Sequence, residues 1–201
     1  MSPFPLTSTS LLDYNRYLSL LAGNDAFVPP PTSAYDLLAT EILTGPQTSV
    51  TFSNLNNYST DYKHLQIRMV VKGSRTGGNH EFYYTVNGGS SYWNHYLVGN
   101  GSTVGSGNFS YSKMFLAQFP GSDLANIYSA GVMDILDPFE TNKNKTIRTL
   151  FGGTADGVRI TLASSLVPST AAVNSISLGM EPAGSFVSGT RFSLYGTKAV
   201  A

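Results

Sequence analysis

Apolar and polar residues alternate along much of this chain, and the clearest case is Tyr62–Lys72. Every second residue there is apolar: Leu65, Ile67, Met69 and Val71. A period of two places one set of side chains on each face of a strand, so this pattern predicts a strand with one face on a core. We take Tyr62–Lys72 as the centre of the fold.

The expected neighbour of this strand is Asn126–Asp137, the longest apolar run in the second half of the chain. Turn-forming Gly, Pro, Asn and Asp separate the other segments with a strand pattern, and Asn87-Gly88 suits a tight hairpin. These other predicted strands are Asp36–Leu43, Ser49–Ser53, Glu81–Val86, Trp93–Val98, Lys113–Phe119, Lys145–Gly152, Val158–Ala163, Val173–Met180 and Thr190–Tyr195. Many short strands without long helices between them predict an all-β fold for residues 35–201, an antiparallel, jelly-roll-like β-sandwich.

Residues 1–34 do not show the strand pattern of the rest of the chain. Apolar residues recur there at helical spacing, at Leu11, Tyr14, Leu18 and Leu21. Extended backbone is imposed further on by Pro29, Pro30 and Pro31. We interpret this segment as a short helical, proline-rich arm, because a short helix needs a surface on which to bury its apolar stripe. It either folds back on the β-domain or anchors the protein to a partner.

Composition limits the classes of partner. Charged residues make up 12% of the 201 residues, the formal net charge is zero, and no basic cluster favours nucleic-acid binding. The chain has no cysteine, so disulfides and thiolate chemistry do not arise. No apolar run reaches the length of roughly 20 residues that spans a bilayer, and no signal-peptide pattern opens the chain.

Aromatic residues gather at Tyr92, Trp93, His95 and Tyr96, in a region rich in Gly, Ser and Asn. Rings beside hydroxyl and amide groups can stack on sugars, and Tyr and Trp also favour protein interfaces. An ordinary strand with alternating aromatic residues explains the same pattern. Three interpretations therefore stay open: glycan contact, protein contact and a purely structural role.

Catalytic and cofactor motifs are not evident. The three histidines, His64, His80 and His95, do not have the spacing of metal ligands, and no cofactor or metal site is expected. Gly99–Gly105 lacks the Lys-Ser/Thr ending of a phosphate-binding loop, and we interpret it as a flexible loop. The only carboxylates grouped closely enough for acid–base work are Asp134, Asp137 and Glu140.

Four short phrases carry a resemblance to a known group of proteins. They are Val50–Ser53, Tyr62–Arg68, Thr141–Arg148 and Phe192–Lys198. In wording and order they resemble small β-rich virion proteins of tailed bacteriophages, of the head-decoration (cement), head-fibre or tail-fibre type. The resemblance covers about residues 34–198 and leaves the arm outside it.

This resemblance implies a non-enzymatic structural protein of the virion, assembled in the host cytoplasm and extracellular after lysis. It implies a homo-oligomer, with a trimer favoured, that binds major capsid or tail proteins. We expect a capsid decoration or head-fibre subunit attached through residues 1–34. The alternative is a tail-fibre or receptor-binding component whose Tyr92–Tyr96 segment contacts host-surface glycan. A third interpretation is a carbohydrate-active enzyme that uses Asp134 with Asp137 or Glu140.

Overall fold

The structure is a computed structural model, and it describes residues 35–76, 80–119, 125–154, 158–181 and 184–198. The chain divides into two units, Met1–Ala34 and Tyr35–Ala201, and all described residues belong to the second. The predicted arm and its residues lie outside the described part of the chain; these residues are Leu11, Tyr14, Leu18, Leu21, Pro29, Pro30 and Pro31.

The described residues of the second unit form strands and one short 3₁₀ helix, η1, at Leu55–Tyr58. No helix of the described residues is long and apolar enough to cross a membrane. The strands are β1 (Tyr35–Ile42), β2 (Ser49–Phe52), β3 (His64–Val71), β4 (His80–Val86), β5 (Tyr92–Gly99), β6 (Val104–Tyr111), β7 (Met114–Phe119), β8 (Ser129–Leu136), β9 (Lys145–Thr154), β10 (Val158–Val167), β11 (Ile176–Glu181) and β12 (Arg191–Thr197).

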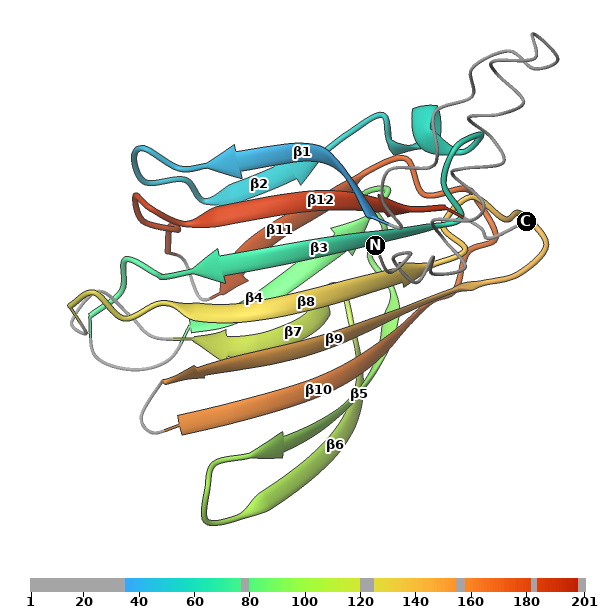
Figure 1. The fold of residues 1–201 in the computed structure, drawn as a ribbon. Helices are drawn as coiled ribbons and strands as arrows, with labels where there is room; N and C mark the ends of the chain where they lie inside the picture. The colour runs from blue at the N-terminus through green and yellow to red at the C-terminus, as the bar shows by residue number, and fades with distance from the viewer. Residues whose placement is uncertain (1–34, 77–79, 120–124, 155–157, 182–183, 199–201) are drawn as a thin grey trace, which may run out of the picture. The chain divides into compact units, whose positions relative to one another are not determined.

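These strands form two antiparallel sheets. The large sheet has eight strands in the order β1-β12-β3-β8-β9-β10-β5-β6, and the small sheet has four in the order β2-β11-β4-β7 (Figure 1). The chain passes from one sheet to the other at every connection except the β5–β6, β8–β9 and β9–β10 hairpins. The prediction of an antiparallel all-β sandwich is confirmed.

The predicted central pair is also confirmed. β3 pairs with β8 along its whole length, from His64↔Leu136 to Val71↔Ser129. On its other side β3 pairs with β12, so strands from the middle and the end of the sequence are neighbours. The alternating apolar residues of β3 are buried, as the period of two predicts.

The core lies between the facing sides of the two sheets. At its centre Phe82 of the small sheet meets Phe186 and Phe192 edge to face, with ring centroids 5.5 and 6.2 Å away. Phe151 of β9 contacts Phe82 in the same way at 6.0 Å. All four rings are at most 1% exposed, and edge-to-face contacts of this kind stabilise a core beyond the area they bury.

One strand was not expected from the sequence. Gly99–Gly105 is predicted to be a flexible loop, but the structure has a turn over residues 100–103 and then β6 from Val104. Asn100 accounts for the tight turn, because its side-chain oxygen accepts the backbone N–H groups of Ser102 and Thr103 at 3.0 and 2.8 Å. The predicted loop is thus confirmed only for residues 100–103, and strand β6 was missed because its Gly, Ser and Asn content hides its pattern.

Candidate interaction surface

The outer side of the large sheet, facing away from the small sheet, is the main candidate for a functional surface. Cross-strand register arranges its side chains in rows, because residues paired across antiparallel strands point to the same face. One row runs Thr40, Ser193, Arg68, Val132, Leu150, Leu162, Leu97 and Ser106. The next row runs Ile42, Arg191, Val70, Ala130, Gly152, Ile160, Gly99 and Val104.

These two rows hold a continuous group of aliphatic side chains that crosses from β3 to β6. We call it the apolar band and define it as Val70, Val132, Leu150, Leu162, Leu97, Ile160 and Val104. Leu150 is 55% exposed, Ile160 is 57% exposed and Leu97 is 53% exposed. Single exposed apolar residues are ordinary on protein surfaces, but a contiguous group marks an interaction site.

Strand β10 shows that the apolar band is not a by-product of packing. Its large apolar residues Ile160 and Leu162 face outward and are exposed, whereas Thr161, Ala163 and Ser165 face the core and are at most 2% exposed. A strand with one solvated face normally has the reverse polarity. The neighbouring strand β5 shares part of this pattern.

On β5, Trp93 and Leu97 face outward and Asn94 is buried between the sheets. The inward polar groups meet one another there, because the Ser165 hydroxyl donates to Oδ1 of Asn94 at 2.8 Å. Burying polar groups inside while leaving aliphatic groups outside costs stability in a monomer. The outer side of β10 is therefore the most unusual exposed surface among the described residues.

The outer side is hollowed in two places. A hollow of about 720 Å³ has Leu37 and Ile42 of β1 on one side and Leu150 and Ile160 on the other. A second, of about 520 Å³, lies over β5, β6 and β10 and includes Leu97 and Leu162. Residues of the apolar band thus line two concave parts of the surface, which a complementary surface can fill.

A polar row borders the apolar band. In it the Gln66 amide donates to Oδ1 of Asp134 at 2.9 Å, and Arg148 Nη2 lies 3.0 Å from Oδ2 of the same carboxylate. Arg68 reaches over from the next row, where Nε donates to Gln66 at 2.8 Å and the guanidinium lies 4.8 Å from the centroid of the Tyr195 ring. An apolar centre with a hydrogen-bonded polar border is the usual anatomy of a protein interface.

The predicted aromatic segment Tyr92–Tyr96 is divided between the two sides of β5. Trp93 and His95 face outward, and Trp93 is 58% exposed. Tyr92 is buried, and its hydroxyl donates to the carbonyl of Val86 and accepts the N–H of the same residue, while burial raises the pKa of the phenol. Tyr96 is half-buried on the inner side, so the four residues do not form one contact surface.

Tyr96 instead lines a smaller hollow of about 260 Å³ together with residues of β4, β6 and β10. Its lining includes Tyr83, Tyr96, Phe109, Glu81 and Arg159. Nε of Arg159 is buried without a hydrogen-bond partner. Aromatic rings beside a charged donor and a carboxylate are suited to small polar ligands. Only Tyr96 of this group was singled out from the sequence, since its partners come from three other strands.

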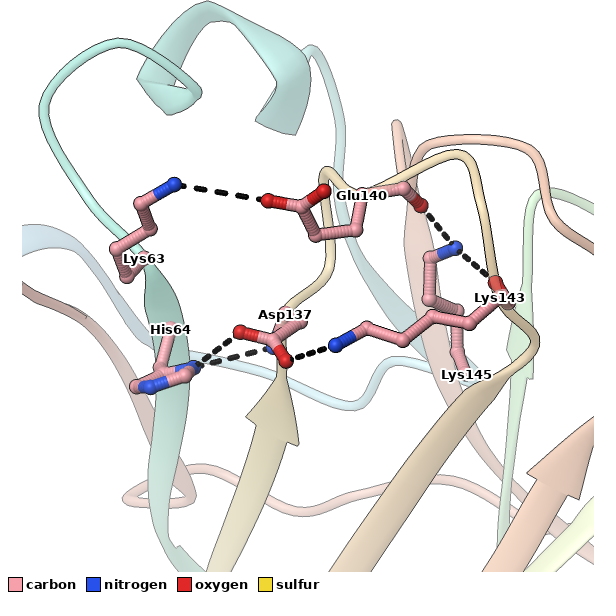
Figure 2. Close-up of polar contacts among 6 residues, drawn as sticks. All are labelled: Lys63, His64, Asp137, Glu140, Lys143 and Lys145. Atoms are coloured by element: carbon pink, nitrogen blue, oxygen red, sulfur yellow. Dashed lines mark hydrogen bonds and ion pairs between the residues drawn. The ribbon is translucent and has the colours of Figure 1, made fainter.

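The three grouped carboxylates are all engaged in contacts with cations. Asp134 lies on the outer face of β8 and is held by Arg148. Asp137 follows the strand, where it forms an ion pair with Lys143, and its Oδ1 lies 3.4 Å from Nδ1 of His64 (Figure 2). Glu140 contacts Lys63 at 3.5 Å.

The contact with Lys143 holds the pKa of Asp137 below its ordinary value. A general acid needs a raised pKa, so Asp137 has the opposite character. Lys145 is buried nearby and donates to the carbonyls of Glu140 and Lys143 (Figure 2). It also donates to the carbonyl of Thr170. This group of residues therefore organises the β8–β9 connection.

Among the described residues, no three His, Cys, Asp or Glu side chains gather as metal ligands would. Of the three histidines, His64 accepts the backbone N–H of Asp137 at 3.1 Å and His95 faces outward from β5. Comparison of the chain with family models, with curated proteins and with solved structures finds no match. The case for a function therefore depends on the geometry of the apolar band.

Proposed function

We propose that this protein is a non-enzymatic structural subunit of a bacteriophage virion, most closely a capsid decoration, cement or head-fibre subunit, which assembles as a homo-oligomer. The resemblance of four short sequence segments to phage virion proteins is the basis for assigning the protein to a virion, and it favours a trimer. The observation that supports an assembling protein is the inverted polarity of β10, which places Ile160 and Leu162 on an exposed face beside Leu97 of β5. Attachment to the particle is assigned to residues 1–34, and the copies meet through the apolar band.

The size of the outer side agrees with this role. Eight strands about 4.8 Å apart and mostly eight residues long make a face of roughly 900 Å². A standard protein interface takes about 800 Å² from each partner. One such face is thus large enough to hold two subunits together without help from another surface.

The first test of the function is immunogold labelling of intact virions produced from the genome that encodes this chain. Label distributed over the heads supports the decoration or head-fibre proposal, and label confined to the tail supports the receptor-binding alternative. Particles that lack the protein by mass spectrometry would overturn both. Deletion of residues 1–34 should abolish particle binding while the circular dichroism of the β-domain is retained.

The apolar band has its own test. Leu150→Gln with Leu162→Gln should break the contact through the band and lower the molar mass of the oligomer in sedimentation experiments, because two amides replace aliphatic groups at the centre of the contact. The matched control is Thr146→Gln with Ser164→Gln, which changes the same two strands and the same face outside the band. Equal behaviour of the two pairs would contradict assembly through the band.

A receptor-binding role is the second candidate, and it has one observation of its own. The hollow lined by Tyr83, Tyr96, Phe109, Glu81 and Arg159 offers ring faces, a cation and a carboxylate, which together suit a saccharide. Trp93 is a second, separate aromatic group on the outer face. Arg159→Ala and Trp93→Ala virions should then adsorb more slowly to host cells, and unchanged adsorption of both variants would remove this candidate.

A further inference from the structure

The edge strands of the two sheets differ in how they are protected. An edge strand presents unpaired N–H and C=O groups, and proteins shield such strands with charges, bulges, prolines or short length. Among the described residues, the edges are β1 and β6 of the large sheet and β2 and β7 of the small sheet. Three of these four carry a recognisable protection.

On β1, the register shifts between Leu37 and Ala39, and the strand bears Asp36 and Glu41. β2 has only four residues. The pairing of β7 with β4 is irregular at Phe82 and Tyr83. Each device makes the strand a poor template for further pairing.

β6 carries none of these devices. It is eight residues long and pairs with β5 without a register shift, from Tyr92↔Tyr111 to Gly99↔Val104. Its sequence, VGSGNFSY, contains no charged residue and no proline. Six of its eight residues are exposed, and Figure 1 shows β6 as the outermost strand of the large sheet.

We propose that β6 is a docking edge for a second copy of this chain. The β6 strands of the two copies pair antiparallel about a two-fold axis and join the two large sheets into one continuous sheet. Because β6 has no charged residue, it can pair with its own copy without repulsion between like charges. Pairing of β1 with its own copy would bring the carboxylates of Asp36 and Glu41 near those of the partner.

The geometry favours β6 with β6 over β6 with β1. A two-fold contact uses the same edge of both copies and closes, whereas pairing one edge with the other leaves free edges and grows into a fibre. The bulge and charges of β1 oppose that second arrangement. A second copy therefore fits β6 better than it fits β1.

The apolar band also reaches this edge. Val104 lies on β6 itself, and Leu97 and Leu162 lie on the next two strands. Pairing at β6 therefore places the bands of two copies side by side on one enlarged face. This contact goes beyond the proposed function, and it uses a different surface from an oligomer formed by stacking the bands.

The test compares the two ends of one cross-strand row. Ser106 of β6 and Thr40 of β1 are both exposed and end the row that contains Leu150 and Leu162. Ser106→Lys places two like charges near each other across the proposed dimer axis, whereas Thr40→Lys adds the same charge to the other edge. Dimerisation of the full-length chain is followed by sedimentation velocity over a concentration series, with circular dichroism to show that each variant is folded.

We expect the wild type to associate at least to a dimer. The dissociation constant of the β6 contact should be at least about tenfold higher for Ser106→Lys and unchanged for Thr40→Lys. Amide hydrogen exchange in residues 104–111 should slow when the protein is concentrated into the dimer and stay fast in Ser106→Lys. A wild-type chain that is monomeric at about 100 µM, where micromolar dimers are almost fully formed, would overturn the proposal. The proposal would also be overturned if Leu150→Gln with Leu162→Gln dissociates the oligomer completely to monomer and Ser106→Lys has no effect on it. That result would not contradict the proposed function.

Discussion

The two faces of the large sheet have similar side chains and opposite surroundings. On the inner face, Ile67, Met133 and Phe192 are fully buried and face the small sheet. On the outer face, Leu150, Leu97 and other aliphatic groups stand open at more than half of their area. Apolar composition alone therefore does not tell which face holds the fold together. The inner face stabilises the monomer, and the outer face is the surface to which we assign the proposed contact between copies.

The largest expected effect separates the two faces directly. Phe192→Ala should lower the free energy of unfolding by about 3–5 kcal/mol, because it removes a buried ring and leaves a cavity. Leu150→Ala removes an exposed side chain and should change it by no more than about 0.5 kcal/mol. Urea unfolding is measured at a low protein concentration, where association does not contribute. A cost for Leu150→Ala near that of Phe192→Ala would show that the outer face also belongs to the monomer's core.

A smaller effect is expected at Lys145, the first residue of β9, whose ammonium donates to three backbone carbonyls. Burial lowers the pKa of Lys145, and Lys145→Ala leaves the carbonyls of Glu140, Lys143 and Thr170 without its three donated bonds. The expected loss is about 1–3 kcal/mol in the same unfolding assay, the range for a buried polar group left unsatisfied. Lys145→Met keeps the length of the chain and serves as the control for packing. If the methionine variant is as stable as wild type, the ammonium contributes no net stability.

The sequence predicts the inner face far better than the outer one. Alternation identified β3 and β8 and their pairing, because both strands bury their apolar residues in the expected way. The same rule applied to β10 would bury Ile160 and Leu162, yet these residues face outward while Thr161 is buried. A period of two shows which side chains of a strand share a face, but it does not show which of the two faces lies on the core. For β10, the register with β9 and β5 determines which face is inside.

Two further features depend on contacts between distant strands. β6 was missed because only Val104, Phe109 and Tyr111 give it apolar character among glycines and polar residues. The hollow with Tyr83, Tyr96 and Arg159 unites β4, β5 and β10. Local composition does not reveal either feature. Strand β6 is defined by its pairing with β5, and the hollow is formed by residues that lie on separate strands.

The smallest expected effect concerns the polar contacts beside the outer face. Lys143 holds the pKa of Asp137 below its ordinary value, so the folded state keeps the carboxylate charged to a lower pH than the unfolded chain does. The contribution is present above the unfolded pKa of about 4 and is lost as the pH falls through the lower folded value. Asp137→Asn should therefore be less stable than wild type at pH 7 by under about 1 kcal/mol, the range for ion pairs at the surface. The two proteins should converge as the pH is lowered towards about 2, where the wild-type carboxyl also becomes neutral. Urea unfolding at several pH values measures this difference. A difference that stays constant down to the lowest pH would mean that Asp137 stabilises the turn after β8 through its shape or hydrogen bonds and not through its charge.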